Sequence, residues 1–290
     1  MTALDGFDGL TLQGQEISKR APRADATPIL RVERVSKSFG ERKAVAEVTF
    51  TLGASEIAAV LGPSGAGKTT LFRCLTGLFQ PDAGRIWFGD TDVAHAPLAS
   101  RRQIAIVFQD YNLVRRLTAF ENVLGGRLGH AALWRGILRR FERSDKLKAF
   151  ECLERVGMLE QAHTRADRLS GGQQQRVAIA RALAQEPRLI VADEPVASLD
   201  PASATGVLQL LQNIVRSEGV TVICSLHQVG YARAFAGRII GLARGRVVID
   251  APTNTLGDGD FATLYEPGVS QQAGVAIQPP GLSCGTIPLA

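Results

Sequence analysis

The clearest chemical signal in the chain is the stretch Gly62-Pro63-Ser64-Gly65-Ala66-Gly67-Lys68-Thr69-Thr70. It fits the pattern G-x-x-x-x-G-K-[ST], whose glycines let the backbone wrap around a phosphate with successive N–H groups pointing inward. In such a loop the lysine contacts the β- and γ-phosphates of a nucleotide, and the adjacent hydroxyl binds Mg²⁺. The stretch therefore predicts a nucleotide site with Lys68 on the phosphates and Thr69 on the metal.

A second candidate is the acidic pair Asp193-Glu194, which follows the apolar run 189–192. Hydrolysis of a phosphoanhydride needs a metal to gather charge and a carboxylate to orient or deprotonate water. Two adjacent acids at the end of a strand can serve both needs, because one side chain faces the metal and the next faces the water. The alternative is a capping pair before Pro195, which the phosphate-loop pattern disfavours.

The segments around the phosphate loop must position it. Residues 57–61 form a short apolar run that is typical of a buried strand, and residues 69–78 show helical spacing. The residues expected to face inward from this helix are Leu71, Phe72, Leu75 and Leu78. The helix N-terminus adds its partial positive charge to the phosphate site. With both elements in place, a Gly/Ser-rich turn that matches by chance is the disfavoured alternative.

The order of elements along the chain predicts the fold class. Alternating apolar residues at 30–35 and 48–52 indicate antiparallel strands with one buried face. The apolar runs at 104–108, 188–192 and 220–225 indicate buried strands with helical segments between them. Repeated strand–helix alternation favours an α/β fold whose sheet is mainly parallel and covered on both faces.

The domain organisation follows from changes in composition. Residues 1–28 lack apolar periodicity, so we expect a disordered extension, and residues 266–290, rich in Gly, Gln and Pro, are expected to form a flexible tail. Residues 29–265 then form one domain, with a helical insertion at about 110–168. Asp200-Pro201 predicts an N-cap followed by proline at the first position of a helix.

Composition places the 290-residue chain among globular proteins, with 45% hydrophobic residues, 21% charged residues and a net charge of +5. The four cysteines (Cys74, Cys152, Cys224 and Cys284) lack C-x-x-C spacing, so we expect reduced thiols rather than a metal site or disulfides. Because the sequence shows neither a signal peptide nor an apolar run of about 20 residues, membrane association is expected only through a partner. A basic cluster at 135–148 is interpreted as a solvated helix face, with contact to headgroups or nucleic acid as the alternative.

Taken in order and spacing, these motifs resemble the ATP-binding subunits of ABC transporters over about residues 29–265. The most specific of them is Leu169-Ser170-Gly171-Gly172-Gln173, which resembles the signature of that family and lies about 20 residues before Asp193-Glu194. The resemblance implies a P-loop NTPase core with a mainly parallel sheet, an N-terminal antiparallel β subdomain and a helical insertion subdomain.

The resemblance also implies roles for single residues. Asp193 would hold Mg²⁺ and Glu194 would be the general base, while Gln109 would reach the metal and the water, His227 the γ-phosphate, and Phe39 the adenine. The resemblance thus assigns catalysis to Lys68, Gln109, Glu194 and His227; nucleotide binding to Phe39, Gly62, Pro63, Ser64, Gly65, Ala66, Gly67, Lys68, Thr69, Thr70, Gln109, Ser170, Gly171, Gly172, Gln173, Asp193 and Asp200; and metal binding to Thr69, Gln109 and Asp193.

The implied assembly is a homodimer in which two copies pack head to tail. Ser170 and Gly172 of one copy would donate to the γ-phosphate of the ATP held by the other copy, and Ser198-Leu199-Asp200 would link the two sites. The implied partners are membrane permease subunits and, indirectly, a periplasmic substrate-binding protein. The chain would then lie on the cytoplasmic face of the inner membrane, as a peripheral subunit, with no nucleic acid bound.

Two other classes of function remain open as alternatives. A soluble ABC-type ATPase that acts on nucleic acid or ribosomes would usually bring coiled-coil arms, zinc modules or a second ATPase half, and this chain has none of these patterns. A P-loop kinase would leave the signature helix and His227 without a role. The energy-coupling subunit of a membrane transporter is therefore the favoured interpretation.

The segment 108–128 indicates which kind of transporter the subunit would serve. Together with the motifs around Asp193 and His227, it resembles the ATPase subunits of phosphonate importers, although Gly230 stands where those relatives commonly carry an acid. In this family the segment faces the permease, so its sequence is expected to depend on which permease the subunit binds. The alternative is the ATPase subunit of another small-solute importer, for phosphate or polar amino acids.

Overall fold

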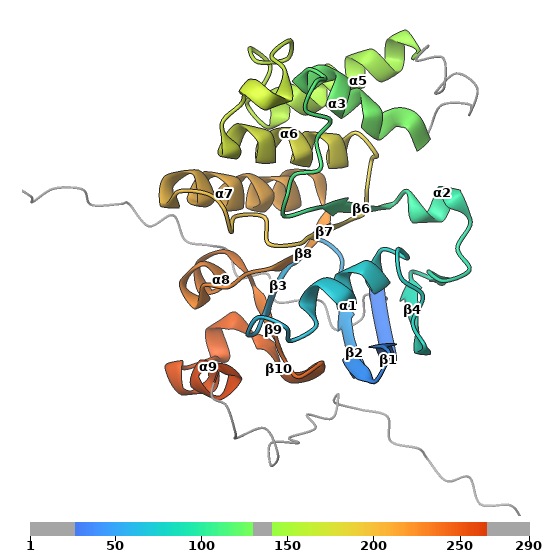
Figure 1. Ribbon diagram of the computed structural model, residues 1–290, viewed down its shortest axis with the longest axis vertical. Coiled ribbons are helices and arrows are strands. Elements are labelled where there is room, and N and C mark those ends of the chain that lie inside the picture. The colour runs from blue at the N-terminus through green and yellow to red at the C-terminus, as the bar shows by residue number, and fades with distance from the viewer. Residues whose placement is uncertain (1–26, 130–140, 266–290) are drawn as a thin grey trace, which may run out of the picture.

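The computed structural model describes residues 27–129 and 141–265 (Figure 1). Residues 1–26 of the predicted disordered extension, the predicted flexible tail, residues 135–140 of the basic cluster and Cys284 lie outside these residues. Within the described part of the chain, no helix combines the length and apolar character that a bilayer crossing needs. Cys74, Cys152 and Cys224 are buried free thiols, as expected.

The core is a six-stranded sheet with the strand order β10-β9-β3-β8-β7-β6. Its strands are β3 (Ile57–Leu61), β6 (Ile104–Val107), β7 (Leu189–Ala192), β8 (Thr221–Ser225), β9 (Arg238–Ala243) and β10 (Arg246–Pro252). Every neighbouring pair is parallel except β9 with β10. The predicted mainly parallel sheet is therefore confirmed, and parallel pairing brings the carboxyl ends of β3, β8, β7 and β6 to one edge.

Both faces of this sheet are buried, because alternate residues of each strand enter different hydrophobic cores. On one face Ala59 and Leu61 pack with the helices of the insertion and with α7 (Pro201–Glu218). On the other face Ala58 and Val60 pack with α1 (Lys68–Leu75) and the N-terminal strands. Burial on both faces explains why these strands are continuous apolar runs rather than alternating patterns.

The N-terminal strands form a separate antiparallel sheet with the order β2-β1-β4-β5, as predicted. They are β1 (Leu30–Phe39), β2 (Arg42–Leu52), β4 (Ala83–Phe88) and β5 (Thr91–Asp92). Short helix α2 (Leu98–Arg101) leads from this sheet into β6. The hairpin turn between β1 and β2 places Phe39 next to the phosphate loop.

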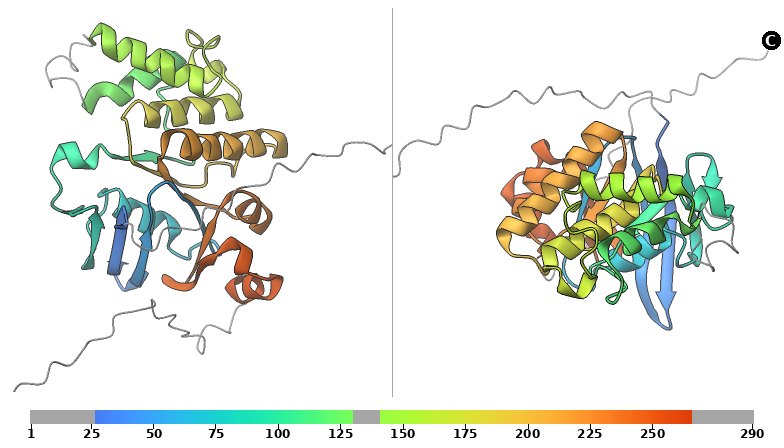
Figure 2. Two further views of the ribbon diagram at one scale, coloured as in Figure 1. Left: turned by 180° about the vertical axis from the view of Figure 1, so that it is seen from behind. Right: turned by 90° about the horizontal axis from the view of Figure 1, so that it is seen from above.

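The helical insertion gathers at one end of the molecule, above α7 and away from the N-terminal sheet (Figures 1 and 2). It contains α3 (Ala119–Leu124), the 3₁₀ helix η1 (Gly125–Gly129), α5 (Arg143–Arg155) and η2 (Ala166–Arg168), and it packs on α6 (Gly171–Leu183), which follows it in the chain. The remaining described helices are α8 (Val229–Phe235), which packs on β3 and α7, η3 (Thr253–Thr255), which packs on α8, and α9 (Asp258–Tyr265), which lies beside β9 and β10.

Two details differ from the sequence prediction. Leu78 was expected to face inward from the first helix, but its side chain is 56% exposed. The helix ends at Leu75, and Gly77 then turns the chain through a left-handed conformation with φ of 70°. Helical spacing in the sequence at 123–128 also predicts a helix there, but α3 ends at Leu124 and the chain continues as η1, which leaves Leu128 half exposed.

Candidate nucleotide-binding site

The phosphate loop joins β3 to α1, and its backbone shape requires glycine. Gly62 and Gly67 have φ of 152° and 102°. A Cβ atom on Gly62 would lie 2.0 Å from the Leu242 carbonyl oxygen, and one on Gly67 would lie 2.1 Å from that of Ala44. Strands β9 and β2 thus lie close against the loop, and the N-cap of α1 is Gly67, which has no side chain to cap the helix. The first N–H groups of α1 are therefore available to an anion.

Lys68 is folded back into the loop. Its side chain is buried, and Nζ donates to the carbonyl oxygens of Gly62 at 2.7 Å and Pro63 at 3.2 Å. An ammonium group has three donors, so these bonds fix its direction while one donor remains for a ligand. Burial lowers the pKa of Lys68, whereas the nearby carboxylates of Glu194 and Asp193 raise it. The lysine is a fixed cation that faces two acids across the loop.

The acidic pair lies at the carboxyl end of β7. Asp193 is buried and Glu194 is part-buried, with φ of 49°. Glu194 Oε1 lies 2.5 Å from His227 Nε2, so the predicted base and the predicted histidine are in direct contact. The two residues come from neighbouring parallel strands, β7 and β8, which explains how positions 33 apart in the sequence meet.

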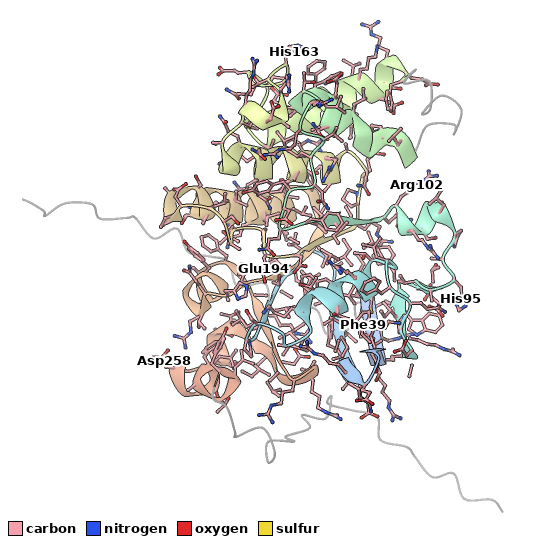
Figure 3. All side chains as sticks on the ribbon, viewed as in Figure 1. Phe39, His95, Arg102, His163, Glu194 and Asp258 are labelled. Carbon is pink, nitrogen blue, oxygen red and sulfur yellow. The ribbon has the colours of Figure 1, made fainter. Side chains whose placement is uncertain are left out.

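A cleft of about 320 Å³ opens in front of the phosphate loop. Its lining comprises Phe39, Arg42, Ala44, Ser64, Gly65, Ala66, Gly67, Lys68, Thr69, Thr70 and Glu194. Phe39 is half exposed, and its ring makes an edge contact with Phe79 at 5.6 Å between centroids, which leaves ring surface available for stacking. Figure 3 labels Phe39 at the N-terminal sheet and Glu194 at the parallel sheet, the two sides that this cleft joins.

Gln109 is not among the described residues that line the cleft. It follows β6 by two positions and is exposed. The Asp193 N–H donates to the Val107 carbonyl oxygen at 2.8 Å, so Gln109 leaves the sheet at the same edge as the acidic pair. The structure thus places Gln109 beside the site without making it a lining residue of the cleft.

The signature residues stand apart from the phosphate loop. Ser170 is the N-cap of α6: its Oγ accepts from the Gln173 N–H, and the Gln173 side chain accepts from the Ser170 N–H at 2.9 Å. Ser170, Gly171, Gly172 and Gln173 are not among the described residues that line the cleft. Asp200 caps α7, as predicted, by accepting from the N–H groups of Ala202 and Ser203, and its bonds to Ser203 lower its pKa.

Two residues near the chemistry were missed from the sequence. Ser225, fully buried, accepts a hydrogen bond from the Glu194 N–H and donates one to Asp193. Arg42 lines the cleft, with its guanidinium 3.5 Å from the Gly65 carbonyl oxygen. The signal for Ser225 was a hydroxyl in an apolar strand two residues before His227, whereas Arg42 has no distinguishing pattern around it.

Comparison with known proteins agrees with this geometry. The family described as "ABC transporter" matches residues 45–197. A solved nucleotide-free ATP-binding cassette from an ABC transporter is 26% identical, with a TM-score of 0.72 over 82% of this chain and 95% of that one. A dimeric cassette solved in a post-hydrolysis state with ADP and Pi is 31% identical, with a TM-score of 0.66 over 77% and 98% of the two chains.

The chain belongs to the ABC transporter family, and it is an ATP-binding subunit of that family. It is 50% identical to the hypophosphite import ATP-binding protein HtxD of Stutzerimonas stutzeri, over 82% of this chain and 71% of the relative. It is 44% identical to the phosphonates import ATP-binding protein PhnC 1 of Rhodopseudomonas palustris (strain HaA2), over 82% and 86%. These relatives confirm the predicted resemblance to importer ATPases.

Proposed function

We propose that this chain hydrolyses ATP in the cleft between Phe39 and Glu194 and so energises the import of a phosphonate or a related phosphorus oxyanion. The observation that carries the hydrolytic part is the contact of Glu194 with His227 beside the phosphate loop. The substrate class rests on the similarity to import proteins across four fifths of the chain.

In this proposal the phosphates lie at the N-terminus of α1. Residues 62–70, apart from Pro63, supply backbone N–H groups, and Lys68 supplies the positive charge. Phe39 stacks on the adenine from the opposite side of the cleft. The residues also fit Mg²⁺, because Thr69 and Asp193 offer oxygen ligands. Asp193 accepts one hydrogen bond from Ser225 on Oδ1, so its carboxylate has acceptor sites left for a metal. Gln109 would be the remaining contact of the metal, and the ion, when bound, would neutralise charge on the phosphates.

Glu194 acts as the general base on the attacking water. With the proton of His227 on Nε2, this nitrogen donates to Oε1 of Glu194 and fixes the plane of the carboxylate. Oε2 then remains to accept a proton from water, whose oxygen forms the new bond to the γ-phosphorus while ADP leaves. Because the glutamate and the histidine leave neighbouring strands, their relative position is set by the sheet.

The site is completed by a second copy of the chain. Ser170 and Gln173 lie on α6, outside the described lining of the cleft, so the signature can serve a nucleotide held elsewhere. The Ser170 Oγ accepts from Gln173, which leaves its own proton free to donate to a γ-phosphate. The solved cassette that is dimeric with ADP and Pi supports this arrangement, in which Asp200 lies between the two sites.

The proposed partner is a membrane permease that docks on the segment 108–128. Two large apolar side chains on this part of the insertion, Val114 and Leu128, are 56% and 50% exposed. Such side chains are suited to a protein interface. The chain would reach the cytoplasmic face of the inner membrane through this contact and would act with a periplasmic substrate-binding protein.

The imported compound has two candidates. A phosphonate is favoured by the phosphonates import relatives, which match 81–82% of the chain. Hypophosphite is the second candidate, because the relative at 50% identity is named for its import. Both are small phosphorus oxyanions, so each can be supplied as the single phosphorus compound in one growth experiment that separates the two candidates.

The test is growth of the source organism with a single phosphorus compound, comparing wild type with a Lys68→Ala strain. We expect the variant to fail on a phosphonate or on hypophosphite while it grows normally on phosphate. Failure on hypophosphite alone would select the second candidate. Equal growth of both strains on both compounds, with other transporters of these compounds deleted, would contradict the proposed substrate class.

A further inference from the structure

Ser225 occupies the position where three functional segments meet. It is the last residue of β8 and is fully buried, and it pairs with Val60 of the strand that enters the phosphate loop. On its other side, β8 pairs with β7, which ends at the acidic residues. Two residues later the same chain reaches His227.

The hydroxyl of Ser225 is a hydrogen-bond acceptor and a hydrogen-bond donor at the same time. Its Oγ accepts a hydrogen bond from the Glu194 N–H at 2.7 Å and lies 2.9 Å from Asp193 Oδ1. The backbone N–H can only donate, so the hydroxyl proton must point to the carboxylate. One side chain therefore holds the backbone of the predicted base and the carboxylate of the predicted metal ligand.

The backbone of Glu194 needs such a restraint. Its φ of 49° is in the left-handed region, which side chains other than glycine rarely adopt. This conformation turns the glutamate side chain away from the strand direction, and its carboxylate reaches His227. Ser225 accepts a hydrogen bond from the Glu194 N–H, and only one residue separates it from His227 in the chain. It therefore restrains both residues of the Glu194–His227 contact.

We propose that Ser225 is a positioning residue for ATP hydrolysis, which sets Asp193 for the metal and Glu194 for the water. This inference rests on the proposed function. The competing explanation is that Ser225 only satisfies a buried N–H group, in which case its loss would lower the stability of the fold and leave the chemistry unchanged.

Four variants separate these explanations. Ser225→Ala removes the hydroxyl, Ser225→Thr keeps it, and Ser225→Cys keeps nearly the same shape with a much weaker donor. Cys224→Ala is the matched control, because it also removes one buried atom from the neighbouring residue of β8 and touches neither acid. All are made in the full chain, and kcat, KM and thermal stability are measured.

We expect kcat of Ser225→Ala to fall about tenfold or more, as for loss of a hydrogen bond to a charged group, with KM nearly unchanged. Ser225→Thr should recover most of kcat, and Ser225→Cys should not. A kcat for Ser225→Ala within twofold of Cys224→Ala would overturn the inference. If Ser225→Ala does not fold, a Ser225→Cys variant with normal kcat would overturn it equally.

A binding measurement keeps this test separate from the proposed hydrolysis. Calorimetric titration of ATP with EDTA and with Mg²⁺ gives the gain in affinity that the metal provides. We expect Ser225→Ala to bind metal-free ATP with the wild-type affinity. We expect Mg²⁺ to raise the ATP affinity of this variant several-fold less than it raises that of wild type. A full gain in the variant would contradict the proposed role at Asp193, whereas a wild-type protein that binds ATP without hydrolysing it would contradict the proposed function instead.

Discussion

The molecule contains two glycine-rich turns that open helices, and they differ in how their N–H groups are used. The turn before α1 ends in Gly67, which cannot cap the helix, and its lysine bends into the loop. The turn before α6 begins with Ser170, whose side chain and that of Gln173 satisfy each other's backbone N–H groups. The N-terminus of α1 has no side-chain cap, whereas at α6 the Gln173 N–H is capped by Ser170 and the N–H groups of Gly171 and Gly172 remain for an anion.

The two turns also differ in exposure. Lys68 is buried beneath the cleft, while Ser170 is exposed at the start of α6. One copy thus holds the phosphate half buried and the signature half exposed. The proposed composite site between two copies rests on this contrast, and the predictions below test its two halves.

The largest effect is expected at the phosphate half. Glu194→Gln keeps the shape of the side chain and removes the base, so hydrolysis should fall by about 10²- to 10⁴-fold. ATP binding should persist, because the phosphate loop is unchanged. Steady-state turnover and equilibrium binding of ATP measure the two effects separately. Wild-type turnover in Glu194→Gln would remove this residue from the chemistry.

The next effect concerns the signature half. Ser170→Arg places a bulky side chain on the exposed end of α6, so it should leave ATP binding to the single copy intact while hydrolysis falls about 10²-fold. Because Glu194→Gln should bind ATP without hydrolysing it, we expect ATP to hold that variant as a dimer. Adding Ser170→Arg to it should abolish this dimer, as followed by size-exclusion chromatography. A loss of ATP binding by the isolated copy would indicate that both halves act within one chain.

A smaller effect is expected from the cap itself. Gln173→Ala removes one side of the reciprocal cap and should lower the free energy of unfolding by about 1 kcal/mol. Gln173→Glu keeps an acceptor for the Ser170 N–H, so stability should be retained, yet its negative charge would face the γ-phosphate and slow hydrolysis. Chemical denaturation and turnover of both variants separate the two roles. Equal turnover in Gln173→Glu and wild type would place Gln173 away from the nucleotide.

The smallest effect is expected outside the two halves. A chain limited to residues 29–266 should hydrolyse ATP at the wild-type rate, because the terminal segments offer too little apolar surface to offset an ordering entropy of about 1–2 kcal/mol per residue. Turnover and ATP affinity of the shortened chain are the measurements. Loss of ATP binding would show that the ends belong to the nucleotide site or to its fold.

The sequence predicted those features that depend on neighbours along the chain. Asp200 caps α7 and Pro201 opens it, as the sequence predicted, because caps are local signals. The buried strands were found since both faces are covered and their runs are wholly apolar. Leu78 was misplaced because apolar spacing continued past the true end of the helix at Leu75.

The role of Ser225 could not be predicted in the same way. Its two hydrogen bonds reach residues 32 and 31 positions away, and they exist only because β7 and β8 pair in one register. A serine in an apolar strand is otherwise indistinguishable from a small core residue. The relation between the two glycine-rich turns is likewise a matter of three-dimensional position, and across two copies it depends on an interface.

The most direct test of the composite site uses heterodimers purified with two different affinity tags. Pairing a Lys68→Ala copy with a Ser170→Arg copy leaves one site with intact phosphate and signature halves, so hydrolysis should persist. Pairing a Lys68→Ala, Ser170→Arg double variant with wild type damages one half of each site, so hydrolysis should be lost. Hydrolysis by the second heterodimer and not by the first would contradict the account, because the signature would then serve the phosphate loop of its own chain.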